Sequence, residues 1–227
     1  MADAGLFAAT YTIINSENDR FSILKGKKEM KPLLIAYASH SGSTREIAQF
    51  LCAELSARSF TVDTRPLTEI SDITPYEFII AGGLLYRFGW HPQIIQFLEK
   101  NLAELQKKRV ALFVTGMHLV KTPKCDQLSY PIFIDPAMEN PVWARQKPGI
   151  FDGGSTIDGY LRQALPVIEQ IKPVCLAFFA GKLDLHTLKL PEQMIMRFLM
   201  LLTGMKTGDY RNWDVLQTWG QRLFSGN

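Results

Sequence analysis

Residues 33–44 read Leu-Leu-Ile-Ala-Tyr-Ala-Ser-His-Ser-Gly-Ser-Thr. The first six are almost continuously apolar, as in a strand that helices cover on both faces. Beyond Gly42, the apolar residues Ile47, Leu51 and Leu55 follow at helical spacing. The stretch therefore predicts a strand, a short hydroxyl-rich loop and a helix, in that order.

The rest of the chain repeats this alternation of strand and helix. Further strands are predicted at 61–67, 78–81, 110–114 and 174–179, and further helices at 92–107, 156–171, 191–203 and 213–224. Five strands that alternate with helices predict an α/β fold with a doubly wound five-stranded parallel sheet and helices on both faces.

Two segments lack a regular pattern. Residues 1–29 have little periodicity and are interpreted as an N-terminal tail, which leaves 30–227 as one domain. Residues 119–155 contain five prolines and three glycines but also enough aromatic residues to pack. A loop of this length inside a compact domain is usually functional or disordered, so we predict a long, partly ordered insertion after the fourth strand.

Composition excludes several classes of protein. A hydrophobic fraction of 47% with 21% charged residues is typical of a globular protein. The net charge of +3 is small, and the Lys and Arg residues are scattered along the chain. Both observations disfavour nucleic-acid binding. Three widely spaced cysteines fit neither a disulfide framework nor a metal site and indicate a cytoplasmic protein. The sequence also lacks a signal peptide and an apolar run of the roughly 20 residues that span a membrane.

The loop after the first strand is the strongest candidate binding site, because ligands of parallel sheets bind at the carboxyl ends of the strands. Hydroxyl groups can donate to phosphate oxygens, and the start of the following helix supplies N–H groups and positive potential. The loop lacks both the dinucleotide fingerprint and the P-loop lysine, which favours a mononucleotide. An ordinary Ser/Thr-capped helix start is the alternative. The predicted phosphate-binding residues are Ser39, His40, Ser41, Gly42, Ser43 and Thr44.

A second loop, Gly82–His91, combines glycines with aromatic residues, as the binding of a flat heteroaromatic ring requires. Arg87 can offset negative charge on a reduced flavin or a carboxylate substrate. Alternatively, Tyr86 and Phe88 pack under the insertion and Arg87 is a solvated surface charge. The predicted ring-binding residues of this loop are Leu85, Tyr86, Arg87, Phe88, Gly89 and Trp90.

A third loop follows the fourth strand and can close over the same ligand. Its predicted binding residues are Thr115, Gly116, Met117 and His118. Arg87, Trp90 and His118 would bound the reactive face, although a lone histidine in a loop is more often structural. No side chain is assigned as a catalytic acid or base.

These loops resemble those of a known family. Ser39–Thr44 resembles the Ser/Thr-x-Thr-Gly-x-Thr phosphate loop of flavodoxins, with serine at the third position. Residues 44–48 are similar to the following helix of menaquinone-dependent protoporphyrinogen IX dehydrogenases. The likeness extends to Tyr86, Gly89, His91, residues 180–183, Phe198, Lys206, Trp213 and Asp214. It implies a flavodoxin-like fold, non-covalent FMN with its phosphate at 39–44, and an isoalloxazine between the second and third loops. The insertion and the tail depart from the family pattern.

Three functional hypotheses follow. The first is an FMN-dependent oxidoreductase of heme biosynthesis that passes electrons from a reduced substrate, with protoporphyrinogen IX the leading candidate, to a quinone. The second is a flavodoxin-type electron carrier that docks to redox proteins, although carriers are usually acidic and this chain is slightly basic. The third is a binding protein that has lost FMN, which the loop residues 42–44 disfavour.

The helix predicted at 191–203 is apolar nearly all round and rich in methionine. It can lie in a membrane interface, as a peripheral contact at the inner face, and bring the flavin to a lipid quinone. It can equally be a core helix or a contact in a homo-oligomer, because its polar face is thin.

Overall fold

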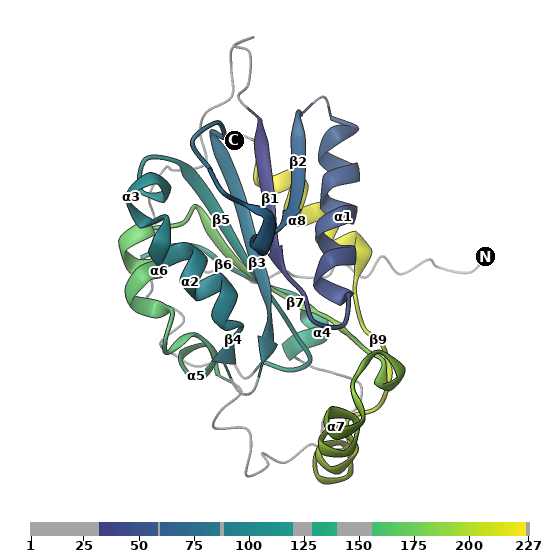
Figure 1. Ribbon diagram of the computed structural model, residues 1–227. Helices are drawn as coiled ribbons and strands as arrows, with labels where there is room; N and C mark the ends of the chain where they lie inside the picture. The colour runs from purple at the N-terminus through teal and green to yellow at the C-terminus, as the bar shows by residue number, and fades with distance from the viewer. Residues whose placement is uncertain (1–31, 59, 87–88, 120–128, 140–155, 226–227) are drawn as a thin grey trace, which may run out of the picture.

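A computed structural model shows a doubly wound α/β fold (Figure 1) and describes residues 32–58, 60–86, 89–119, 129–139 and 156–225. The five expected strands are β1 (Leu33–Ala38), β2 (Val62–Pro66), β3 (Phe78–Tyr86), β5 (Arg109–Gly116) and β7 (Cys175–Ala180). They pair in parallel in the order β2-β1-β3-β5-β7. From β1 the chain adds β2 on one side, and it then adds β3, β5 and β7 on the other. Parallel sheets bind ligands where the strand order reverses in this way, here between β1 and β3. The predicted fold class is confirmed.

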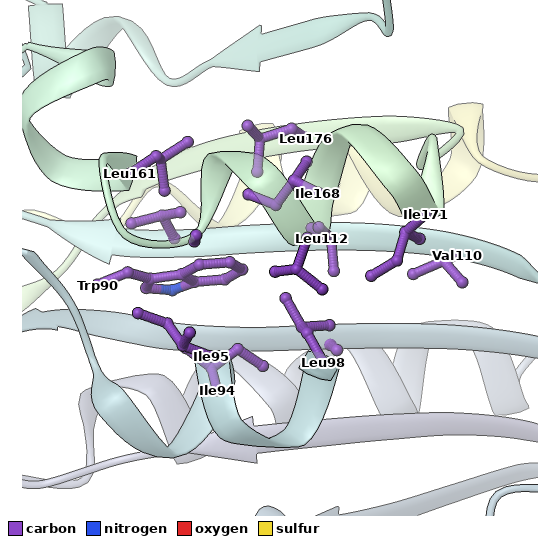
Figure 2. Close-up of a cluster of buried hydrophobic side chains, with 14 of the residues drawn as sticks. Trp90, Ile94, Ile95, Leu98, Val110, Leu112, Leu161, Ile168, Ile171 and Leu176 are labelled. Atoms are coloured by element: carbon purple, nitrogen blue, oxygen red, sulfur yellow. The ribbon is translucent and has the colours of Figure 1, made fainter. Parts of the chain in front are cut away.

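Helices cover both faces of the sheet. One face carries α1 (Ser43–Ser56) and α8 (Trp213–Arg222), and the buried residues beneath them form one core. The opposite face carries α2 (Pro92–Lys100), α3 (Leu102–Leu105), α5 (Ile157–Leu161) and α6 (Leu165–Ile171). Figure 2 shows part of this second core, in which side chains from α2, α6, β5 and β7 surround Trp90. β1, β3, β5 and β7 are therefore buried on both sides, which explains their continuous apolar runs, whereas the edge strand β2 has no buried side chain.

Two strands of the seven-stranded sheet were missed by the sequence analysis. β6 (Ile132–Ile134) lies within the predicted insertion and pairs in parallel with β7, at the edge of the sheet. Its three apolar side chains are all buried, so a short apolar run was enough to extend the sheet. β4 (Gly89–Trp90) pairs antiparallel with the end of β3 and turns the predicted second loop into a hairpin. Residues 120–128 and 140–155 of the insertion, and the tail 1–29, lie outside the described residues.

Asp135 anchors β6 and the short helix α4 (Pro136–Glu139) that follows it. Its carboxylate accepts hydrogen bonds from the backbone N–H of Ala137, at 2.9 Å, and of Ala180, at 3.2 Å. Burial raises the pKa of this carboxyl group, and the two backbone hydrogen bonds oppose the shift. The segment that leads from β6 is thereby fastened to the carboxyl end of β7.

The expectation that a flexible loop begins at Gly82 is wrong. β3 continues through Gly82 and Gly83 to Tyr86, and both glycines pair with β1 and β5. A Cβ atom at Gly82 would lie 2.2 Å from the ring of Phe113. A glycine is therefore required at this position of β3, because the ring of Phe113 on the neighbouring strand β5 occupies the space of a side chain.

Two predicted helices are each divided in the structure. The helix predicted at 92–107 breaks at Asn101, whose side-chain amide donates to the carbonyl of Phe97 at 2.8 Å. The helix predicted at 156–171 breaks between Leu161 and Leu165, where Pro166 occupies the first turn of α6.

The C-terminal segment after β7 forms a separate small unit. β8 (Lys182–Leu183) and β9 (Gly208–Asp209) pair antiparallel and enclose the short helix η4 (Leu185–Thr187) and the long helix α7 (Leu190–Thr203). Figure 1 shows α7 beyond the carboxyl ends of the strands, below the start of α1. Within the described part of the chain, no helix has the length and apolarity needed to cross a membrane.

Candidate functional site

A pocket of about 380 Å³ opens at the carboxyl ends of β1, β3 and β5, where the chain changes direction in the sheet. This volume falls within the range of roughly 300–1,000 Å³ that small-molecule sites occupy. Three groups of residues surround it: the loop after β1, the ends of β3 and β5, and the segment from β8 to α7. The pocket is lined by Ser39, His40, Ser41, Ser43, Thr44, Leu84, Leu85, Thr115, Gly116, Met117, Gly181, Lys182, Leu183, Leu188, Glu192, Ile195, Met196 and Leu199.

The loop after β1 is shaped to expose the start of α1. Gly42 has a φ of 93°, a conformation that favours glycine, and its N–H donates to the hydroxyl of Ser39 at 3.2 Å. No described side chain caps α1, and the backbone N–H of Glu46 donates to the Gly42 carbonyl at 2.9 Å. The N–H groups of the first turn are therefore available to an anion, and they carry the positive end of the helix dipole.

Two of the loop hydroxyls also hold the site together. Thr44 is buried, and its hydroxyl lies 2.8 Å from the hydroxyl of Thr115 at the end of β5. The hydroxyl of Ser43 accepts from the backbone N–H of Lys182 at 3.0 Å and keeps its own proton to donate. These bonds join the first loop to the third loop and to β8.

The second loop contributes less to the pocket than predicted. Leu85 and the unpredicted Leu84 line the pocket from the end of β3. Trp90 does not, because its ring is buried in the core (Figure 2) and its indole N–H donates to the Gly83 carbonyl at 3.1 Å. Gly89 pairs with Tyr86 in the hairpin and does not line the pocket. Arg87, Phe88 and the side chain of Tyr86 lie outside the described residues.

Three of the four predicted residues of the third loop line the pocket, namely Thr115, Gly116 and Met117. A Cβ atom at Gly116 would lie 2.6 Å from Cδ1 of Leu85, so this glycine allows the second and third loops to meet. His118 does not line the pocket, and its carbonyl accepts from the hydroxyl of Tyr160 on α5 at 3.0 Å. This position favours the structural alternative for His118.

The third group, the segment from β8 to α7, was missed by the sequence analysis as part of the site. Leu183, Leu188, Ile195, Met196 and Leu199 give it an apolar surface. The apolar helix at 191–203 was noted in the sequence, but nothing in its spacing indicated that it faces the phosphate loop. Only the fold, which brings the segment after β7 to the same sheet edge as the loop after β1, reveals the contact.

A hydrogen bond joins this segment to the phosphate loop. Nε2 of His40 lies 3.1 Å from Oε2 of Glu192, and both side chains are about one-third exposed. The same carboxylate oxygen accepts from the backbone N–H of Lys189 at 3.2 Å. The hydrogen bond from His40 lowers the pKa of Glu192, with a further contribution from the Lys189 N–H. Glu192 is thus held as an anion at the edge of the pocket.

Among the described residues that line the pocket, Lys182 alone carries a permanent positive charge, and the sequence analysis also missed it as a site residue. Lys182 lines the pocket directly after Gly181, and its ammonium group lies 3.8 Å from Asp184. The position beside the start of α1 suits a group that offsets phosphate charge. Across the described residues, no cluster of three or more His, Cys, Asp or Glu side chains could bind a metal ion.

Comparison with known proteins agrees with this geometry. A family model described as a flavodoxin domain matches residues 34–209. No curated protein matches the sequence.

Among solved structures, an archaeal flavodoxin is 17% identical with a TM-score of 0.35. The match covers 37% of this chain and 62% of the archaeal one, so the chain spans less than two thirds of that relative. The Megasphaera elsdenii flavodoxin is 14% identical over 64% of this chain and 84% of its own, with a TM-score of 0.41. Flavodoxin 2 of Bacillus cereus is 16% identical over 85% and 97%, with a TM-score of 0.44. These identities are too low to indicate a substrate.

Proposed function

The chain belongs to the flavodoxin family, whose cofactor is FMN, and from this premise we propose that it is an oxidoreductase that passes electrons from a reduced substrate to a quinone. Protoporphyrinogen IX is the leading candidate substrate, which would place the protein in heme biosynthesis. The proposal also includes a cytoplasmic location and a peripheral contact of residues 191–203 with the inner face of a membrane. A homo-oligomer is compatible with it.

One observation carries the proposal: the pocket joins a phosphate-binding end to an apolar wall. At one end lie the first turn of α1, the hydroxyls of Ser41 and Ser43, and Lys182. At the other lie Met196 and Leu199 of α7. A mononucleotide that carries a flat ring has its charge at one end and its apolar surface at the other, so these residues fit FMN.

Each part of the pocket then has a role. The residues 39–44 and Lys182 hold the phosphate, while Leu84, Leu85 and the backbone of Thr115–Met117 border the ring. FMN, when bound, supplies the transfer of electrons and hydride. The protein's own contribution is to bind, to orient and to exclude water, because no side chain of the pocket is placed as a catalytic acid or base.

The apolar wall favours a quinone over a protein acceptor. Leu188, Ile195, Met196 and Leu199 give one side of the pocket an apolar surface that suits an apolar acceptor, and flexible methionine suits ligands of irregular shape. The quinone would take up two electrons and two protons from the reduced protein. A carrier that docks to redox proteins usually presents an acidic rim, whereas this chain has a net charge of +3.

A flavodoxin-type electron carrier is the second candidate function, because the family includes proteins without a substrate of their own. Its specific support is the small size of the pocket, about 380 Å³, which bound FMN would largely fill. The two functions differ in whether a small molecule reacts with the reduced protein.

The test begins with an FMN titration of the purified protein, followed by anaerobic reduction and addition of a menaquinone analogue. We expect a flavin spectrum that protoporphyrinogen bleaches and the quinone restores. Binding of FMN without either reaction would favour the carrier. Failure to bind FMN would overturn the proposal.

Two matched variants show whether the flavin occupies this pocket. Ser41→Glu places a negative charge in the phosphate loop and is expected to weaken FMN binding at least about tenfold, through like-charge repulsion. Ser56→Glu places the same charge at the opposite, exposed end of α1 and should leave the affinity unchanged. Equal effects of the two substitutions would place the phosphate elsewhere.

A further inference from the structure

Helix α7 has two apolar faces, and the described residues bury neither of them. Its inward face lines the pocket through Met196 and Leu199. Among the described residues of the whole chain, all of the exposed large hydrophobic side chains belong to this helix. They are Leu190, Met194, Ile195, Phe198, Leu201 and Leu202, with exposed fractions between 40% and 76%. No side chain of α7 is buried by the described part of the chain.

The charges around the outward face are mainly positive. Lys189 precedes the helix, Arg197 lies at its middle, and Lys206 follows its end, and all three are exposed. The one acidic residue of α7, Glu192, is turned inward to His40. An apolar strip bordered by cations complements a surface that is itself apolar inside and negatively charged outside, which is the character of an anionic lipid bilayer.

A second copy of the chain fits this face less well. Two antiparallel α7 helices related by a two-fold axis would meet at their midpoints. Arg197 lies at the midpoint of Leu190–Thr203 and would therefore face its own symmetry mate. Such a contact places like charges together at the centre of the interface, whereas anionic headgroups accept the same cations favourably.

We propose that the outward face of α7 docks on an anionic lipid surface and thereby holds the pocket beside the bilayer. The helix lies in the plane of the interface, with Met194, Phe198 and Leu201 among the acyl chains and Lys189 and Lys206 among the headgroups. The inward face of the same helix is the apolar wall of the pocket, so a molecule dissolved in the bilayer reaches the site along α7. This route rests on the proposed function, but the docking itself requires neither FMN nor a quinone.

Vesicle flotation tests the docking on the full chain without added flavin. We expect the protein to float with vesicles of phosphatidylglycerol and phosphatidylcholine, and to float several-fold less with phosphatidylcholine alone. Phe198→Glu should lower the partition coefficient at least about tenfold, because it places a charge in the apolar strip. Lys189→Glu should lower it at least about fivefold on anionic vesicles. Lys100→Glu, at the end of α2, makes the same charge change elsewhere and should have no effect.

Several outcomes would overturn the proposal. These are no flotation of the parent chain, equal flotation on neutral and anionic vesicles, and a concentration-dependent dimer in sedimentation that Phe198→Glu abolishes. Flotation that appears only after removal of residues 1–29 would assign the face to the chain's own N-terminal segment. Circular dichroism of each variant shows that it is folded. A chain that floats but binds no FMN would refute the proposed function and leave the docking intact.

Discussion

Helices α1 and α7 are the same length, 14 residues, and both border the pocket, yet they relate to the core in opposite ways. In α1 the side chains of Thr44, Ile47, Ala48, Leu51 and Leu55 are buried, and polar residues occupy the outer face. In α7 no side chain is buried by the described residues, although its sequence is the more apolar of the two. Apolar content alone therefore does not place a helix in the core.

The difference follows from the pattern of each sequence. The apolar residues of α1 recur every three or four positions, so they form one stripe that the sheet covers. The apolar residues of α7 surround the helix, so the pocket can cover only part of them. We infer that α1 stabilises the fold and positions the phosphate, while the outward face of α7 is reserved for a partner.

The largest predicted effect is on stability, and it compares a buried residue of α1 with an exposed residue of α7. Leu51→Ala removes a fully buried side chain and should lower the free energy of unfolding by about 2–5 kcal/mol. Leu201→Ala, the same substitution on the outward face of α7, should change it by less than about 0.5 kcal/mol. Urea denaturation followed by circular dichroism measures both values. A large loss of stability in Leu201→Ala would mean that α7 is covered within the chain.

The fold was largely predictable from sequence because strands buried on both faces are continuously apolar. β1 and β5 were found for this reason, whereas β6 has only three residues and lies among prolines, where a short apolar run carries little information. Gly82 was misassigned to a loop because a glycine pair usually marks a turn. The ring of Phe113, 31 positions later in the chain, is what requires it, and no local pattern contains that contact.

The second prediction concerns how the two helices are fastened. A buried hydrogen bond joins Thr44 of α1 to Thr115, whereas a partly exposed one joins Glu192 of α7 to His40. Thr44→Val leaves the Thr115 hydroxyl buried without that partner and should cost about 1–3 kcal/mol. The double substitution of Thr44 and Thr115 by valine removes both groups and should cost less than the sum of the single ones. Additive effects in this double-mutant cycle would contradict the coupling.

The third prediction concerns one glycine at the end of each helix. Gly42 directly precedes α1 with a φ of 93°, and Gly204 directly follows α7 with a φ of 79°. Alanine is strained by about 1–2 kcal/mol at either position. Gly42→Ala should weaken FMN binding roughly tenfold, because the strained loop no longer presents the N–H groups of α1. Gly204→Ala carries a similar strain away from the pocket and should leave the affinity within about twofold. Quenching of flavin fluorescence on binding gives both dissociation constants.

The pocket was predicted best where its lining comes from a loop that directly follows a strand. Ser39, Ser41 and Thr115 line the pocket as expected, because the end of each parallel strand delivers its loop to the same edge. Lys182 and Glu192 could not be found this way. They reach the pocket from the segment after β7, and their position depends on how that segment folds back over α1.

The smallest predicted effect is the pH dependence of the partly exposed hydrogen bond between His40 and Glu192. The hydrogen bond from His40 lowers the pKa of Glu192 below its ordinary value of 4.5, so the bond stabilises the fold when the carboxylate is ionised. This contribution is complete above about pH 5 and is lost as the pH falls through the lowered pKa of the folded state. Parent and Glu192→Gln should therefore differ in unfolding free energy near neutral pH and converge as the pH falls through the lowered pKa of the folded state, and added salt should also reduce the difference. His40→Gln should abolish the same pH-dependent part, because it removes the partner that lowers the pKa. If the difference between parent and Glu192→Gln were independent of pH, the bond between α7 and the phosphate loop would not contribute to stability, and α7 would be held over the pocket by its apolar contacts alone.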